Sequence, residues 1–321
     1  MTLNIKPPSQ ELGVQGNHSP AGRESERGQR PLSATVQDAH TRAPVRLGRI
    51  GYLNVLPIYN PLESGAVAHD FVIESGPPAR LNQIMEAGGL DLSACSSIEY
   101  ARRPERYLLV PDLAIGSCGP VQSVLLLSRV PLDRARTILV SAQTHTSAAL
   151  MRVMLAERFG LRPSFESGDI QSRLAAGEPP QAFLAIGDEA LRLRRHPEYP
   201  YSLDLGSEWN AWTGLPFIFG VWIVSREAAA RLGPRLDEAV RTLLAAKAHG
   251  AARLGDYARL GASQGILDEP TLRSYFRGLV YDLGPEEQEG LRAFYAKLAQ
   301  AGAIPAAPRL EFHQPRVVEA A

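Results

Sequence analysis

The chain has 321 residues, and its 34 Lys and Arg balance 34 Asp and Glu, so no net charge attracts it to nucleic acid or to an anionic membrane surface. Its length predicts a large core and two domains, because single cores rarely grow much past ~250 residues. The sequence has no apolar run near the ~18 residues of a membrane span and no secretory signal, which predicts a cytoplasmic protein. We therefore expect small-molecule partners, and neither nucleic acid nor membrane.

The two cysteines, Cys95 and Cys118, have no His or Cys neighbours at the spacing of a metal site. We interpret both as buried small hydrophobic residues rather than as a nucleophile or a disulfide. The sequence also lacks paired carboxylates, a phosphate-binding loop and a Ser/His/Asp set, so it predicts no metal and no cofactor. Any chemistry must therefore rest on binding and positioning.

Residues 1–47 are rich in Gly, Pro, Ser, Gln and Arg and show neither a helical nor a strand periodicity. Such a composition buries too little apolar surface to offset the entropy of ordering. We predict a disordered leader, or residues upstream of the true start. The pattern becomes alternating and strand-like over residues 45–52, and Pro57 stands where a helix can begin.

Strand and helix patterns then alternate through the first two thirds of the chain. After Pro77-Pro78, a helix is predicted over residues 79–87, because Leu81, Ile84 and Met85 share one face before Gly88-Gly89 end it. Further strands are predicted at residues 90–94, 121–127, 137–140, 182–186 and 216–225, and a further helix at 148–159.

The last third of the chain is predicted to be mostly helical, with a final helix opening at Gly284-Pro285. An alternating first part followed by helices fits an α/β fold of two lobes that the chain enters, leaves and re-enters. We predict lobe 1 from residues 48–127 plus 218–300, lobe 2 from residues 128–217, and a C-terminal tail over residues 301–321.

Five segments share one design: an apolar run that reads as a strand ends in small hydroxyl or amide residues. Strand ends of an open α/β sheet present backbone N–H groups to ligands. Five such ends predict a cleft that holds a small polar or anionic molecule through neutral hydrogen-bond donors. The segments are residues 51–57, 91–100, 121–124, 144–147 and 186–188.

The first two segments carry Asn54, Ser96 and Ser97. The Asn54 amide can donate to and accept from a ligand, or it can form a turn that ends the strand. Either serine can face the cleft or cap the following helix, and the spacing favours Ser96 for the ligand and Ser97 for the cap.

The next segments carry Ser123, Thr146 and Ser147. Ser123 is a hydroxyl on an apolar strand, so it needs either a main-chain partner or the ligand. Thr146 and Ser147 stand directly before a predicted helix, where a hydroxyl and free N–H groups cap the helix and can also bind an anion. We interpret the neighbouring His145 as a solvent-facing loop residue.

The remaining candidates offer two roles each. Asp188 can orient a ligand hydroxyl or cap the helix that follows it. Phe217 ends the aromatic-dense segment that contains Trp209 and Trp212, which suits a pocket wall or packing beneath a strand. Tyr52 precedes Asn54 and is an aromatic candidate for the same wall.

Taken in order, these motifs resemble chorismate dehydratase of the futalosine route to menaquinone over residues 48–300. The resemblance rests on Gly-Tyr-Leu-Asn-x-x-Pro (51–57), the Leu-Asp to Glu-Tyr segment (90–100), Val-x-Ser-Val (121–124), Thr-Ser (146–147), Ile-Gly-Asp-x-Ala-Leu (186–191), Asp-Leu-Gly-x-x-Trp (204–209) and Thr-Gly-Leu-Pro-Phe (213–217). Together the motifs are specific, although none is specific alone.

The resemblance implies a type II periplasmic-binding-protein-like fold, with two α/β lobes that close on a carboxylate ligand. It implies that chorismate is the substrate and that water is lost to give 3-[(1-carboxyvinyl)oxy]benzoate. We expect a monomer or a homodimer. By the same resemblance Asn54 and Ser96 are the catalytic residues, and Tyr52, Ser97, Ser123, Thr146, Ser147, Asp188 and Phe217 bind the substrate. His145 has no counterpart in the family pattern and is not assigned a role.

Two alternatives remain open. One is 1,4-dihydroxy-6-naphthoate synthase, a similar enzyme whose first loop resembles Ser-Pro-Cys-Pro-Asn-Asp, a run that this sequence lacks. The other is a non-catalytic solute-binding protein for a small carboxylate, which would normally be exported and is therefore disfavoured by the missing signal.

Overall fold

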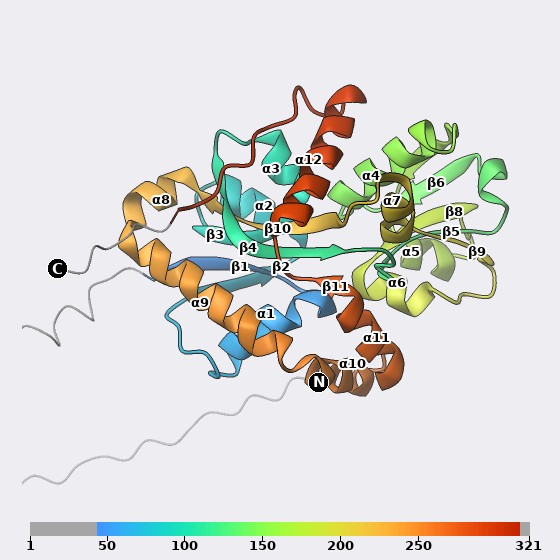
Figure 1. Ribbon diagram of the computed structural model, residues 1–321. Helices are drawn as coiled ribbons and strands as arrows, with labels where there is room; N and C mark the ends of the chain where they lie inside the picture. The colour runs from blue at the N-terminus through green and yellow to red at the C-terminus, as the bar shows by residue number, and fades with distance from the viewer. Residues whose placement is uncertain (1–43, 315–321) are drawn as a thin grey trace, which may run out of the picture. The chain divides into compact units, whose positions relative to one another are not determined.

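Two mixed β-sheets, each with its own helices, form the framework of the computed structural model, which describes residues 44–314 (Figure 1). The six-stranded sheet has the order β11-β4-β10-β3-β1-β2 and the five-stranded sheet the order β7-β6-β8-β5-β9. Two α/β lobes were predicted, and the two sheets confirm them. The predicted leader lies outside the described residues except for residues 44–47.

The first sheet is built from both ends of the described chain. Strands β1 and β2 and strands β1 and β3 pair in parallel, whereas β10 runs antiparallel between β3 and β4. The strands are β1 (Arg46–Ile50), β2 (Val72–Gly76), β3 (Leu92–Ser96), β4 (Tyr107–Ser117), β10 (Phe217–Ser225) and β11 (Leu279–Val280). The helices that accompany them are α1 (Leu56–Glu63), α2 (Pro78–Glu86), α3 (Ser97–Arg102), α8 (Arg226–Leu232), α9 (Pro234–Ala251), α10 (Leu254–Ser263), α11 (Glu269–Gly278) and α12 (Pro285–Gln300).

The second sheet comes from one continuous stretch of chain. Its strands are β5 (Val124–Ser128), β6 (Thr137–Val140), β7 (Ser164–Ser167), β8 (Ala182–Ile186) and β9 (Tyr201–Asp204). Its helices are α4 (His145–Glu157), α5 (Ile170–Ala175), α6 (Gly187–Leu193), α7 (Leu205–Thr213) and the short η2 (Leu132–Arg134). A second short helix, η1 (Leu53–Val55), follows β1 of the first sheet. Strands β5 and β8 are buried almost throughout, as their near-continuous apolar sequences predict.

The crossing between the lobes lies earlier than predicted. The sequence places residues up to 127 in lobe 1, but β5 belongs to the second sheet, so the chain crosses between Ser117 and Val124. The crossing loop contains Gln122 with φ of 61°, a left-handed conformation that is uncommon for a residue other than glycine. The Asp204 carboxylate holds this loop by accepting the Val121 N–H at 3.1 Å and the Gln122 N–H at 2.7 Å.

Both ends of the predicted lobe 1 also need correction. Arg46 and Leu47, which the prediction assigns to the leader, form the start of β1. The predicted tail packs on the first lobe: Leu109 on β4 exchanges backbone hydrogen bonds of 2.8 Å with Glu311 and His313. His313 Nε2 also lies 2.7 Å from Asp237 Oδ1 on α9. Residues up to 313 therefore belong to the lobe.

Candidate active site

A pocket of about 700 Å³, including its open mouth, lies between the loops of the two lobes. Of the residues predicted from the sequence, Tyr52, Asn54, Ser96, Ser123, Thr146 and Ser147 line it. Ser97, Asp188 and Phe217 do not. Residues that the sequence analysis missed also line it, among them Ile50, Cys95, Gln143, Thr144, His145, Phe219 and Trp222.

Asn54 brings an unpartnered acceptor to the pocket. It lies in η1, directly after β1, and its side-chain oxygen Oδ1 is buried without a hydrogen-bond partner among residues 44–314. Its backbone carbonyl accepts the Tyr281 hydroxyl at 3.1 Å, which fixes the loop from behind. A buried polar atom normally has a partner, so Oδ1 is suited to accept a hydrogen bond from a ligand hydroxyl.

Ser96 and Ser97 have different roles, and the predicted cap is wrong. Ser96 stands at the end of β3, lines the pocket and makes no side-chain bond to α3. Ser97 is fully buried and donates its hydroxyl hydrogen to the Ile218 carbonyl at 2.8 Å, so it neither caps α3 nor reaches the pocket. Ser96 is therefore the hydroxyl of this loop that can meet a ligand.

Thr146 caps a helix of the other lobe rather than its own. Helix α4 begins at His145, so Thr146 lies inside the first turn, and its Oγ1 accepts the Ile98 N–H of α3 at 3.0 Å. The prediction that Thr146 and Ser147 cap α4 was wrong for this reason. Ser147 lines the pocket, and its hydroxyl bonds no other described side chain or carbonyl. Together with the free N–H groups of the α4 N-terminus, it suits a carboxylate.

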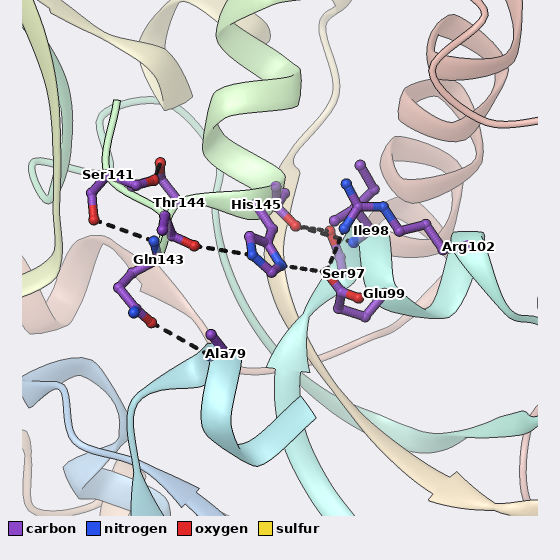
Figure 2. Close-up of polar contacts among 11 residues, drawn as sticks. Ala79, Ser97, Ile98, Glu99, Arg102, Ser141, Gln143, Thr144 and His145 are labelled. Carbon is purple, nitrogen blue, oxygen red and sulfur yellow. Dashed lines mark hydrogen bonds and ion pairs between the residues drawn. The ribbon is translucent and has the colours of Figure 1, made fainter. Parts of the chain in front are cut away.

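His145 bridges the two lobes at the pocket mouth, whereas the sequence suggested a solvent-facing residue. Its Nδ1 lies 2.6 Å from Glu99 Oε1 and its Nε2 3.1 Å from the Ala142 carbonyl, as Figure 2 shows. Burial favours the neutral form of Glu99, but the hydrogen bond from His145 and the charge of Arg102 outweigh it and lower the pKa of Glu99. Both ring nitrogens of His145 are therefore engaged, one with α3 of the first lobe and one with the loop before α4.

Asp188 ties the lobes together on the opposite side. It lies in the first turn of α6, and its Oδ1 accepts the Leu53 N–H of η1 at 3.0 Å, so its predicted cap of α6 was wrong. Burial raises the pKa of Asp188, although the Leu53 N–H and Arg192 act in the other direction. Asp188 therefore supports the Asn54 loop from lobe 2 without lining the pocket.

Tyr52 and Gly187 meet across the same junction. Gly187 has φ of 56°, and a Cβ added there would lie 2.9 Å from the Tyr52 ring. Only glycine permits both the left-handed backbone and this close approach. Burial, with a smaller effect of the Asp188 charge, raises the pKa of Tyr52 to about 12, so its hydroxyl stays protonated.

Phe217 is a core residue, and Phe219 takes its expected place. Phe217 is fully buried, and its ring centroid lies 5.2 Å from that of Trp209 and 4.8 Å from that of Phe294. The ring centroid of Phe219 lies 4.5 Å from that of Phe217, and Phe219 lines the pocket. The Phe-x-Phe pattern of β10 was visible in the sequence, but nothing in it showed which ring met the aromatic cluster.

The pocket lining contains no Lys, Arg, Asp or Glu, and His145 is its one histidine. Within residues 44–314 no group of three or more His, Cys, Asp or Glu side chains is arranged to hold a metal ion, and no helix there is long and apolar enough to cross a bilayer. The site thus offers hydroxyls, the side-chain amides of Asn54 and Gln143, an imidazole and a helix N-terminus, which suits a polar anion.

A family model described as menaquinone biosynthesis matches residues 45–300. The chain belongs to this menaquinone biosynthesis family. The matched range spans both lobes, and it ends at the last residue of α12.

Two curated relatives of this family member come from Thermus thermophilus. A chorismate dehydratase is 29% identical over 280 residues, covering 83% of this chain and 97% of the relative. A 1,4-dihydroxy-6-naphtoate synthase is 29% identical over 234 residues, which cover 71% of this chain and 84% of the relative. A chorismate dehydratase of Campylobacter jejuni is also 29% identical, over 177 residues, which cover 54% of this chain and 64% of the relative.

Solved structures confirm the predicted fold. A protein of Archaeoglobus fulgidus has a TM-score of 0.67 at 15% identity, covering 83% of this chain and all of that one. The periplasmic aliphatic sulphonate binding protein SsuA of Escherichia coli has a TM-score of 0.61 at 15% identity, covering 88% and 95%. The menaquinone biosynthesis family member therefore has the two-lobed periplasmic-binding-protein-like fold.

Proposed function

We propose that this protein is a chorismate dehydratase, a hydro-lyase that converts chorismate to 3-[(1-carboxyvinyl)oxy]benzoate and water. The family match and the full-length similarity to a chorismate dehydratase support the reaction. The observation that carries the proposal is the pairing of the unpartnered Asn54 oxygen with the Ser147 and α4 N-terminus in one pocket. Chorismate offers a hydroxyl to the first and a carboxylate to the second.

The chemistry needs little more than correct positioning. Loss of the C3 hydrogen and the C4 hydroxyl makes the ring of chorismate aromatic, so the reaction is downhill once it starts. Conjugation with the ring carboxylate makes the C3 hydrogen acidic, and negative charge develops on that carboxylate as the proton leaves. Donors that already point at the carboxylate lower the energy of this transition state.

Five polar side chains of the pocket have a role in this scheme. Ser147 and the N–H groups of α4 hold the ring carboxylate, and the His145 imidazole lies beside them in the same lining. Asn54 Oδ1 accepts the C4 hydroxyl hydrogen and orients this leaving group. Ser96 and Ser123 donate to the side-chain carboxylate of the substrate.

The proton acceptor is the side-chain carboxylate of chorismate itself. No Asp or Glu lines the pocket, and Asp188 is engaged with the Leu53 N–H. Both ring nitrogens of His145 are already engaged, with the Glu99 carboxylate and the Ala142 carbonyl, so neither is free to take the C3 proton. The substrate carboxylate therefore remains as the base that can reach the C3 proton. It then passes this proton to the departing C4 hydroxyl, so that water leaves and the carboxylate is restored.

Purified protein incubated with chorismate tests the proposal. We expect a product lighter by one water, with the absorbance of an aromatic ring, and formation that a chelator does not suppress. Chorismate that binds but is recovered unchanged would contradict dehydration and favour a solute-binding protein. Turnover of a naphthoate precursor without turnover of chorismate would assign the chain to the activity of its second curated relative.

A further inference from the structure

Two buried tyrosines from the last third of the described chain support the pocket from behind. Tyr275 on α11 donates its hydroxyl hydrogen to Ser123 Oγ at 3.2 Å, and Tyr281 donates to the Asn54 carbonyl at 3.1 Å. Burial raises the pKa of both phenols well above the usual range. Both hydroxyls therefore stay protonated and act as donors to the site loops.

Only Tyr275 acts on a side chain that lines the pocket. The backbone around Ser123 is fixed by other groups: its carbonyl accepts the Gly187 N–H at 2.7 Å, and Asp204 holds the N–H groups of Val121 and Gln122. The Tyr275 hydroxyl adds nothing to that backbone. Its hydrogen bond must instead determine where the Ser123 hydroxyl points.

The bond from Tyr275 leaves Ser123 with one hydrogen to donate. A hydroxyl carries one hydrogen, and here its oxygen already accepts from the phenol. The one acceptor for that hydrogen among the described residues is the Val121 carbonyl at 3.4 Å, which is a long contact. A ligand oxygen in the pocket, at ordinary hydrogen-bond distance, is the better acceptor, and the bond from Tyr275 polarises the Ser123 hydroxyl toward it.

We propose that Tyr275 is a positioning residue that makes the Ser123 hydroxyl a directed donor to a substrate carboxylate. The proposal rests on the dehydratase function proposed above, and it adds a contact behind the pocket to that site. Without the phenol, the Ser123 hydroxyl can rotate and donate elsewhere. Tyr281 holds the Asn54 loop through a backbone carbonyl and has no such effect on proton direction.

A double-mutant cycle of Tyr275→Phe and Ser123→Ala tests the proposal, with kcat/KM for chorismate and Tm measured for each variant. Ser123→Ala should lower kcat/KM by about 10- to 100-fold, the range expected for a lost bond to a charged group. Tyr275→Phe should lower it by about 5- to 10-fold, and the double variant should match Ser123→Ala within about twofold. Tyr257→Phe is the matched control, because it removes another buried hydroxyl next to Phe276 on α11 and should leave kcat/KM unchanged.

The outcomes separate this proposal from the proposed function. If the wild-type protein does not dehydrate chorismate, the proposed function fails, and the role of Tyr275 fails with it. If the wild type is active but Tyr275→Phe costs the same factor with and without the Ser123 hydroxyl, Tyr275 acts only on the fold, and the positioning role alone is overturned. Equal losses for Tyr257→Phe and Tyr275→Phe would overturn it in the same way.

Discussion

Asn54 is expected to contribute to activity and to lower the stability of the fold. Its buried Oδ1 has no partner among the described residues, so folding carries an uncompensated desolvation cost. Residues that bind or catalyse often carry such a cost, because the missing partner belongs to the ligand. Stability and activity should therefore respond to substitution in opposite directions.

We expect Asn54→Leu to lower kcat/KM for chorismate by at least about 100-fold while Tm stays equal or rises. Asn54→Asp should lower kcat/KM further, because it places a negative charge beside a dianionic substrate. Steady-state kinetics and thermal unfolding of both variants check this. Wild-type activity in either variant would remove Asn54 from the site.

Asp188→Asn should raise Tm at pH 7 but not at pH 3, which lies below the unfolded pKa of 3.8. The folded-state pKa of Asp188 lies above its unfolded value, so the stability that this carboxyl contributes is present at low pH and is lost as pH rises through the folded pKa. Asp169 is the matched control: its bonds from Ser172 lower its pKa, so Asp169→Asn should cost stability at pH 7. Thermal unfolding of both variants at both pH values measures this: at pH 7, Tm should rise for Asp188→Asn and fall for Asp169→Asn.

The same Asp188→Asn variant tests the proton acceptor. Its kcat should fall by much less than the ~10²–10⁴-fold that a general base contributes, because Asp188 accepts the Leu53 N–H and does not line the pocket. A loss of the full factor, together with turnover of a chorismate analogue whose side-chain carboxylate is a neutral amide, would make Asp188 the base and end the substrate-assisted mechanism.

At the scale of elements, the N-termini of α3 and α4 fasten the two lobes at the pocket. Thr146 caps α3 through the Ile98 N–H. The contact between Glu99 and His145, which Figure 2 shows, joins the same two helices. Both contacts join residues of different lobes beside the pocket, so they hold the two sides of the site together. Their loss should weaken binding more than chemistry.

Glu99→Gln should raise KM for chorismate by about 3- to 10-fold with kcat nearly unchanged at pH 7. The pKa of Glu99 is lowered, so its stabilising contribution is present above the unfolded value and is lost as pH falls through the folded pKa. The wild-type KM should therefore rise toward the variant value in acid. Glu86→Gln, which removes a surface ion pair with Arg103, is the control and should leave KM unchanged. A fall in kcat without a change in KM would contradict a role of this ion pair in binding.

The two ends of the chain should respond differently to truncation. Deleting residues 305–321 removes the backbone bonds of Glu311 and His313 to Leu109 and the contact of His313 with Asp237, so Tm should fall by several degrees. Deleting residues 1–43 should leave Tm and kcat nearly unchanged, because that sequence lacks apolar periodicity. Differential scanning calorimetry of both truncations measures this. A large drop for the N-terminal deletion would show that it docks on the fold.

Elements whose apolar pattern is local were predicted well. Residues 137–140 and 182–186 were assigned as strands with the bounds that β6 and β8 have. Caps were predicted poorly, because the partners come from far away in the sequence. Thr146 bonds Ile98 and Asp188 bonds Leu53, and sequence spacing cannot show a partner in the opposite lobe.

At the scale of the whole molecule, the motifs predicted the two lobes and the pocket but not the details of their junction. Residues at strand ends met in one place because strand ends share an edge of each sheet, which is a property of the fold. The crossing point, His145 and Phe219 depend on how one lobe meets the other. How the lobes meet is decided by tertiary contacts, so local sequence patterns do not predict it.

The central claim is that the pocket between the lobes binds chorismate with its C4 hydroxyl at Asn54 and its ring carboxylate at the N-terminus of α4. A crystal structure of the Ser96→Ala variant with chorismate tests it most directly. We predict a ring-carboxylate oxygen within hydrogen-bond distance of Ser147 and the C4 hydroxyl within the same reach of Asn54 Oδ1. Chorismate bound outside this pocket, or in it with the C4 hydroxyl turned away from Asn54, would contradict the account.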